Sequence, residues 1–295
     1  MSTNVNTGAA GHMQGASGLM QSAAGLMKNK RGLIMGVANG HSIAWGIAQA
    51  LHNEGAELAF TYQGEALGKR VKPLAASVGS DFLLSCDVED ISSVDAVFEA
   101  LKAKWGTIDF LVHAIGFSDK NELKGRYVDA TTRENFTRTM VISCFSFTEL
   151  AQRAAKIMPN GGSLLTLTYG GATRVMPNYN VMGIAKAGLE ASVRYLAADL
   201  GPDGIRVNAI SAGPVRTLAG AGINDARFMY NFQLAHSPLR KSITIEDVGG
   251  SALYLLSNLS NGVTGEVHFV DSGYNVISMP HPDTLKAQGG AAEDP

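Results

Sequence analysis

The chain has 295 residues, 45% of them hydrophobic, and a formal net charge of -2 at pH 7. This hydrophobic content can build the core of one large α/β domain or two small ones, and the near-neutral charge argues against a nucleic-acid-binding protein. No apolar run approaches the roughly 18 residues of a membrane span. The only cysteines, Cys86 and Cys144, are too few and too far apart for a disulfide scaffold or a zinc site. We therefore predict no metal site and a reducing, cytoplasmic location.

Both ends of the chain differ in composition from its middle. Residues 1–29 are rich in Gly, Ala, Ser and Met, and they lack the basic segment ahead of an apolar stretch that marks a secretory signal. We interpret them as a disordered N-terminal extension or tag. Residues 279–295 end in Gly, Ala and acidic residues and are interpreted as a tail. The domain is then expected to span residues 30–278.

The first strand is predicted at 32–37 and the first helix at 44–53, with Gly36 and Gly40 in the turn between them. Glycines allow a backbone to approach a pyrophosphate closely, and the start of a helix offers unpaired N–H groups to it. A tight turn and close packing would explain such glycines about as well. This turn alone is therefore a weak indication of a nucleotide site.

Strands and helices alternate along the rest of the chain. Further strands are predicted at 57–62, 82–88, 108–117, 162–168, 204–210 and 265–270, and helices at 94–105, 132–157, 181–200 and 244–256. This alternation predicts a single α/β, Rossmann-like domain, a doubly wound parallel sheet with helices on both faces and the ligand at its carboxyl edge. His113, at the end of an apolar strand, is expected to be structural.

Tyr179 and Lys186 lie near the start of the helix that follows strand 162–168. Seven residues make about two turns, so the two side chains would share one face, roughly 10 Å apart, with room for a cofactor's ribose between them. An ammonium group near a phenol stabilises the phenolate, which makes the pair usable in proton transfer. Taken alone, such a pair would more often be an ordinary aromatic residue and a solvated lysine.

The spacing Tyr169-x9-Tyr179-x6-Lys186 resembles the active site of the bacterial enoyl-acyl-carrier-protein reductases, a divergent branch of the short-chain dehydrogenase/reductase superfamily. The resemblance runs from about Arg31 to Ile277, and residues 178–186 are its most specific part. It implies an NADH-dependent reduction of the trans-2 double bond of enoyl thioesters in type II fatty acid biosynthesis. It also implies an acyl carrier protein as the partner that presents the substrate, and a homotetramer.

The resemblance further implies which residues form the site. Tyr169, Tyr179 and Lys186 are the expected catalytic residues. Besides Lys186, the expected cofactor-binding residues are Gly36, Ser42, Ile43, Gln63, Asp87, Val88, Ile115, Gly116, Val215 and Thr217. Besides the two tyrosines, the expected substrate-binding residues are Met182, Leu218, Ile223 and Met229, of which the last three belong to an expected substrate lid at residues 217–240.

Gln63 ends the second predicted strand, where dinucleotide-binding folds distinguish NADH from NADPH. An acidic residue there would accept hydrogen bonds from a free ribose, and a basic cluster would pair with a 2′-phosphate. Gln63 does neither strongly. Because the NADH-using members of the resembled family often carry glutamine at this position, we expect NADH.

Two alternatives stay open. A carbonyl reductase or alcohol dehydrogenase of the same fold would carry Tyr-x3-Lys and an asparagine in helix 132–157. In this chain Gly183 stands four residues after Tyr179, and the helix reads Met140-Val-Ile-Ser-Cys144. A dinucleotide-sensing binding protein without turnover is disfavoured because Tyr179 and Lys186 are both present.

Overall fold

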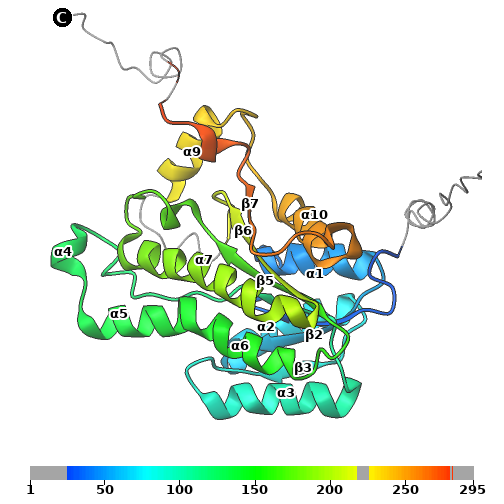
Figure 1. Cartoon of the computed structure of the whole chain (residues 1–295). Helices are drawn as coiled ribbons and strands as arrows, with labels where there is room; N and C mark the ends of the chain where they lie inside the picture. Colours follow the sequence, from blue (N-terminus) through cyan, green and yellow to red (C-terminus); the bar gives the residue numbers. More distant parts are fainter. Residues whose placement is uncertain (1–24, 218–225, 280, 282–295) are drawn as a thin grey trace, which may run out of the picture.

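A seven-stranded parallel sheet forms the centre of the protein, with the strand order β3-β2-β1-β4-β5-β6-β7 (Figure 1). The structure is a computed structural model that describes residues 25–217, 226–279 and 281. The strands are β1 (Arg31–Met35), β2 (Glu57–Tyr62), β3 (Leu83–Ser85), β4 (Phe110–His113), β5 (Gly162–Thr168), β6 (Ile205–Ala212) and β7 (Val267–Val270). Each neighbouring pair is parallel, which confirms the predicted fold class.

Helices cover both faces of the sheet (Figure 1). One apolar core takes side chains from α3, α6 and α7, and a second core takes them from α1, α2 and α10. The helices are α1 (Ile43–Asn53), α2 (Gly64–Ser77), α3 (Ile91–Trp105), α4 (Tyr127–Ala130), α5 (Arg133–Met140), α6 (Ser146–Ala155), α7 (Asn180–Leu200), α9 (Ala226–His236) and α10 (Ile245–Leu256). A π-helical turn, η1 (Val141–Phe145), joins α5 to α6. Helices on both faces explain why the central strands are near-continuous apolar runs.

The ordered domain begins earlier than the sequence predicts. The backbone N–H groups of Gly25 and Leu26 donate to the Glu54 carboxylate at 2.9 and 3.0 Å, and Met27 is buried in the core beside α1. The assignment of residues 25–29 to a disordered extension was therefore wrong, because one buried methionine and one carboxylate anchor them. Residues 1–24 and nearly all of the expected tail lie outside the described residues.

Helices α1 and α10 touch backbone to backbone. A Cβ atom added to Gly46 would lie 2.4 Å from the carbonyl oxygen of Ile245, and one added to Gly249 would lie 2.7 Å from that of Gly46. Only glycine allows two helices to approach this closely. The contact fixes the position of α1, and with it the turn that leads into this helix from β1.

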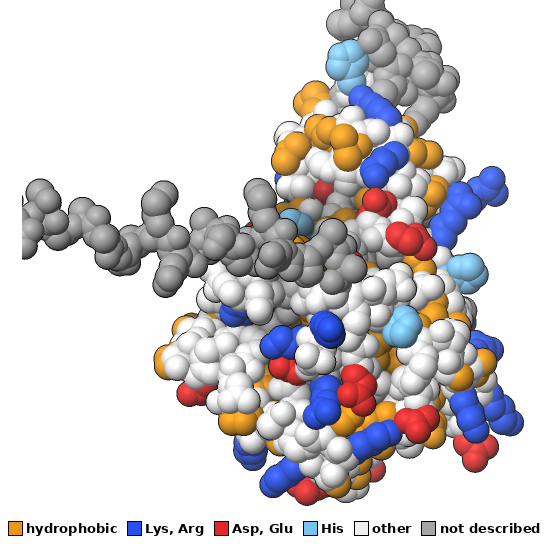
Figure 2. Space-filling model, turned by 90° about the vertical axis from the view of Figure 1, so that its right-hand side faces the viewer, with side chains coloured by type: hydrophobic (Ala, Val, Ile, Leu, Met, Phe, Trp, Pro, Cys, Tyr) orange, Lys and Arg blue, Asp and Glu red, His pale blue; other side chains and the backbone are white. Residues whose placement is uncertain are grey.

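The face seen in Figure 2 carries basic and acidic side chains intermingled, without a large area of one sign. Hydrophobic side chains gather toward its upper end, at the height of α9 in Figure 1. Phe228 on α9 and Leu239 just after it are among the exposed hydrophobic residues.

Among the residues that the structure describes, no helix combines the length and the apolarity needed to cross a membrane.

Candidate active site

A cavity of about 1060 Å³ lies at the carboxyl edge of the sheet, where loops after β1, β4 and β6 meet the end of β5 and the start of α7. The strand order reverses between β1 and β4, and α/β folds bind ligands at such switch points. Twelve of the residues expected in the site line this one cavity: Gly36, Ser42, Ile43, Ile115, Gly116, Tyr169, Tyr179, Met182, Lys186, Val215, Thr217 and Met229.

The turn after β1 depends on Gly36. Its φ is +97°, and an added Cβ atom would lie 2.0 Å from the carbonyl oxygen of Ala114, so no other residue fits there. The Ser42 hydroxyl accepts hydrogen bonds from the backbone N–H groups of Ala38 and Asn39, at 3.0 and 3.1 Å. The turn is thus held open in front of the first residues of α1, where helix N–H groups favour an anion.

Tyr179 immediately precedes α7, and its ring packs into a space that two glycines leave free. A Cβ atom on Gly171 would lie 2.4 Å from Cδ1 of Tyr179, and one on Gly183 would lie 3.7 Å from the same atom. The ring also packs edge-to-face on Tyr169, with the ring centroids 5.1 Å apart. The Tyr179 side chain is 7% exposed, so its orientation is fixed by packing on several sides.

The backbone on either side of Tyr179 is strained. Asn178 and Asn180 have positive φ angles of 55° and 30°, and non-glycine residues in this region are uncommon. The Asn180 amide donates to the carbonyl oxygen of Glu122 at 3.0 Å. Strained backbone that its surroundings hold in place is frequent at functional sites.

Lys186 lies two turns further along α7 and also faces the cavity. Its ammonium group donates to the carbonyl oxygen of Leu167 at 2.9 Å, and the residue is 8% exposed. Burial lowers the pKa of Lys186 to about 8. The side chain is therefore a cation whose charge is sensitive to pH just above neutrality.

The pKa values of both tyrosine phenols are raised, whereas the sequence predicts a stabilised phenolate, and so a lowered pKa, for Tyr179. Burial, with a smaller contribution from Tyr169, raises the pKa of Tyr179. Burial, with a smaller contribution from Tyr274, raises the pKa of Tyr169 to about 12. Desolvation dominates the shift and Lys186 is not among its causes, so the expected stabilisation of a Tyr179 phenolate by Lys186 is not observed. Tyr179 stays protonated and is a hydrogen-bond donor.

The loop after β4 is held against the cavity by a polar strip on α5 and η1. The Ser143 hydroxyl donates to the carbonyl oxygen of Phe117 and accepts from its N–H, both at 2.9 Å. The Asn135 side-chain oxygen accepts from the N–H of Asp119 at 3.0 Å, and the Thr139 hydroxyl lies 2.9 Å from that of Ser118. Ser143, Asn135 and Thr139 thus clamp this loop from one side.

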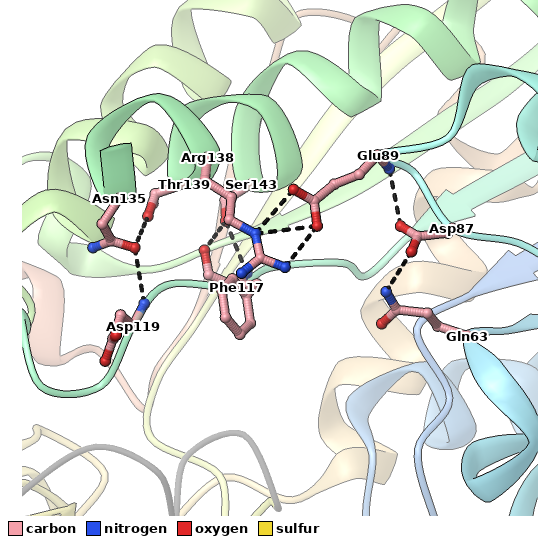
Figure 3. A network of polar contacts seen from close by, with 9 residues as sticks. All are labelled: Gln63, Asp87, Glu89, Phe117, Asp119, Asn135, Arg138, Thr139 and Ser143. Atoms are coloured by element: carbon pink, nitrogen blue, oxygen red, sulfur yellow. Dashed lines mark hydrogen bonds and ion pairs between the residues drawn. The ribbon is translucent and has the colours of Figure 1, made fainter. Parts of the chain in front are cut away.

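Gln63 and Asp87 lie outside the cavity and contact each other, since the Gln63 amide donates to the Asp87 carboxylate at 2.9 Å. Figure 3 shows a polar network that continues from this pair. The backbone N–H of Glu89 donates to the Asp87 carboxylate at 3.0 Å, and the Glu89 carboxylate accepts two hydrogen bonds from the Arg138 guanidinium. The Arg138 guanidinium lies 4.6 Å from the centroid of the Phe117 ring. The pair Gln63–Asp87 is therefore connected to the cavity wall.

Of the remaining expected residues, the structure describes only Val88, which does not line the cavity. Val88 is buried in the core that α3 and α6 share, while Leu218 and Ile223 lie outside the described residues. Several lining residues were not expected: Ala38, Phe117, Ser118, Lys120, Leu123 and Arg216, while Arg227 and Tyr230 belong to the expected lid. Most of them lie in loops that leave strand ends, a position that could have indicated them, but the sequence does not show how those loops turn.

His113 is structural, as expected. Its two ring nitrogens lie 2.8 Å from the Thr166 hydroxyl and 2.9 Å from the Ser146 hydroxyl. Burial, reinforced by the charge of Lys186, lowers its pKa to about 3. It is a neutral residue of the core at physiological pH.

Comparison with known proteins identifies the family. The family model described as enoyl-(acyl carrier protein) reductase matches residues 36–275. The enoyl-[acyl-carrier-protein] reductase [NADH] 2 of Rhizobium meliloti is 76% identical over 254 residues, which cover 86% of this chain and 94% of that protein. The crystal structure of FabI from Candidatus Liberibacter asiaticus superposes with a TM-score of 0.86 at 61% identity, covering 88% of this chain and 100% of the other. An Anaplasma phagocytophilum enoyl-(acyl-carrier-protein) reductase in complex with NAD gives 0.85 at 57% identity, covering 88% and 98%. The fold, the tyrosine–lysine pair in one cavity and these similarities establish that the chain belongs to the enoyl-(acyl carrier protein) reductase family.

Proposed function

We propose that the protein uses NADH to reduce the trans-2 double bond of enoyl thioesters carried by an acyl carrier protein, in type II fatty acid biosynthesis. One observation carries the proposal: Tyr169, Tyr179 and Lys186 line the same cavity of about 1060 Å³ as the glycine turn after β1. This volume has room for a dinucleotide and an acyl chain together. The relatives whose names specify NADH support the choice of cofactor.

The residues at the cavity fit a dinucleotide. The turn at Gly36 and Ser42 brings backbone N–H groups and the start of α1 to one place, which suits a pyrophosphate. Lys186 would hold the nicotinamide ribose, and Ile115, Gly116, Val215 and Thr217 would line the nicotinamide end. When bound, NADH supplies the hydride for the β-carbon of the enoyl thioester.

The protein's own chemistry lies in the two tyrosines. In the proposed mechanism, the Tyr179 hydroxyl donates a hydrogen bond to the thioester oxygen as negative charge develops on it, an interaction that contributes roughly 3 kcal/mol. Its raised pKa suits this role because the phenol remains protonated. Tyr169 packs against Tyr179 and lines the acyl channel, where Met182 and Met229 would contact the substrate.

We propose that the segment 217–240, of which residues 218–225 lie outside the described residues, contributes a cover over the acyl part of the cavity. In its described part, Met229 and Tyr230 of α9 line the cavity, and Arg227 lies beside them. Arg216 approaches α9 from the loop after β6, with its guanidinium 4.4 Å from the centroid of the Tyr230 ring.

We also place the protein in the cytoplasm, because Cys86 and Cys144 are both free thiols.

A cofactor-oxidation assay tests the proposal. Purified protein with NADH and a crotonyl-carrier protein should consume NADH, with crotonyl-CoA and NADPH as parallel comparisons. Oxidation of NADH only with a 3-oxoacyl thioester would identify a carbonyl reductase instead. Binding of NADH by calorimetry without oxidation by either substrate would identify a sensing protein.

Gln63→Arg should shift the cofactor preference toward NADPH. Gln63 is exposed at the end of β2, and an arginine there gives a 2′-phosphate a cationic partner. The substitution also replaces the neutral amide that donates to Asp87, so we expect the kcat/KM for NADH to fall while that for NADPH rises. If the ratio of the two kcat/KM values does not move, Gln63 is not at the discriminating edge.

We further propose a homotetramer. Tyr195 and Ile184 on α7 are 75% and 45% exposed, and Phe145 in η1 is 49% exposed, so these neighbouring helices present apolar side chains that the sheet does not cover. Light scattering should give four times the 31.0 kDa chain mass at micromolar concentration. A mass of 31.0 kDa would contradict the proposal.

A further inference from the structure

Glu190 is a buried acidic residue that the mechanism above does not use. It lies on α7 one turn after Lys186, so the two side chains share a face of the helix. The residue is 8% exposed, and its carboxylate accepts a hydrogen bond from the Thr168 hydroxyl at 2.7 Å. An acidic group is rarely buried to this extent without a specific partner or role.

The end of β5 and the first half of α7 are joined at two consecutive residues. The carbonyl oxygen of Leu167 accepts from the Lys186 ammonium at 2.9 Å, and the hydroxyl of Thr168 donates to Glu190. The next residue along the strand is Tyr169. Strand end, lysine and carboxylate therefore form one unit beside the cavity.

We propose that Glu190 is a positioning residue for Lys186, which keeps the lysine in its ammonium form and, through Thr168, holds the strand end against it. The inference rests on the proposed function in one respect, since it takes NADH as the ligand that Lys186 binds.

Other titratable groups around this pair do not supply the same charge. Cys144, from η1, has its thiol pKa raised by burial, and His113, from β4, has a pKa of about 3, so both are neutral near pH 7. Burial opposes the charge on Lys186, while Cys144 and, to a smaller extent, Glu190 favour it. Because the Cys144 thiol is neutral near pH 7, the contribution of Glu190 is the one present there. Burial also raises the pKa of Glu190, against the Thr168 hydrogen bond and the charges of Arg194 and Lys186. The negative charge of Glu190 thus favours the ammonium form of Lys186.

The sign of the pH dependence follows. Because the pKa of Lys186 is about 8, its ammonium form predominates below pH 8 and is lost as the pH rises through that value. If NADH binding requires the ammonium form, affinity is nearly constant below about pH 7, is about half its maximum at pH 8 and falls about tenfold per pH unit well above it. Isothermal titration calorimetry from pH 6 to pH 10 measures this curve directly.

Glu190→Gln tests the inference. Glutamine keeps the size and an oxygen that can accept from Thr168, but it removes the negative charge. We expect NADH affinity like that of the wild type at pH 6 and about two- to threefold weaker at pH 8, because the alkaline limb moves to lower pH. A matched control is Asp199→Asn, which removes one exposed charge from the same helix, about 20 Å from Lys186 along the axis. It should leave the curve unchanged.

Two further measurements make the result decisive. In the NMR titration of 13C-labelled lysine side chains, without NADH, the Lys186 signal of Glu190→Gln should titrate at lower pH than in the wild type. If Glu190→Gln does not fold, Thr168→Val should move the same signal in the same direction. Loss of the hydroxyl donor raises the pKa of Glu190 and so reduces the negative charge beside Lys186.

Coincident Lys186 titrations in the wild type and the variant would overturn the inference, and so would a loss of affinity that is equal at every pH, which indicates a packing role only. A wild type that does not bind NADH would count against the proposed function instead, and the NADH-independent titration would still decide the role of Glu190.

Discussion

Tyr179→Phe should lower kcat about a hundredfold while NADH affinity stays within about twofold of the wild type. The substitution removes one hydrogen bond to the thioester oxygen, worth roughly 3 kcal/mol in the transition state, and leaves the ring in the space beside Gly171. Steady-state kinetics with a saturating crotonyl thioester gives kcat, and calorimetry gives the NADH affinity.

The same helix offers a control for Tyr179→Phe. Tyr195 lies within α7 but is 75% exposed and away from the cavity, so Tyr195→Phe should retain wild-type kcat. A wild-type kcat in Tyr179→Phe would remove this residue from the mechanism. An equal loss in both variants would point to a general disturbance of α7.

Gly36→Ala should lower the free energy of unfolding by about 3 kcal/mol and abolish detectable NADH binding. At a φ of +97° an alanine is strained, and its Cβ would lie 2.0 Å from a backbone oxygen, that of Ala114, which cannot rotate away. Relief requires β1 and β4 to separate at the edge where the phosphates would bind. Urea denaturation followed by circular dichroism measures the stability, and fluorescence titration measures the binding.

Gly40→Ala is the matched control, in the same turn. A Cβ atom there would meet only the Leu74 side chain, at 3.9 Å, so we expect a change in unfolding free energy within about 0.5 kcal/mol of zero. Equal stabilities of Gly36→Ala and the wild type would show that the turn relaxes without strain, and the argument from close approach would fail.

The sequence predicts the strands best where both faces are covered. β2 and β5 begin and end at the predicted residues, because buried parallel strands are bounded apolar runs. β3 is shorter than predicted, since its pairing with β2 covers only Leu83 to Ser85. The end of a strand depends on its pairing register with the neighbouring strand, and the sequence of one segment does not reveal that register.

Some parts of the candidate site could be predicted from the sequence, and others depend on the fold. Tyr179 and Lys186 could be found because their spacing, together with that of Tyr169, resembles a known active site. The space that Gly171 leaves for the tyrosine ring, the clamp from Ser143 to Phe117 and the pKa shifts caused by burial could not, because each depends on segments that meet only in the folded chain. The pairing of Gln63 with Asp87 joins two strands and was hidden for the same reason.

The π-helical turn at Val141–Phe145 separates two faces of one continuous helical segment. Before it, Asn135 and Thr139 point toward the loop after β4, and after it Phe147 and Leu150 point into the core. A π turn adds one residue to a helix, which corresponds to about 100° of rotation. Deleting one residue within the turn would restore a regular α-helix and rotate one face away from its partner. The length of this helical segment is therefore fixed by the angle between the two surfaces that it contacts.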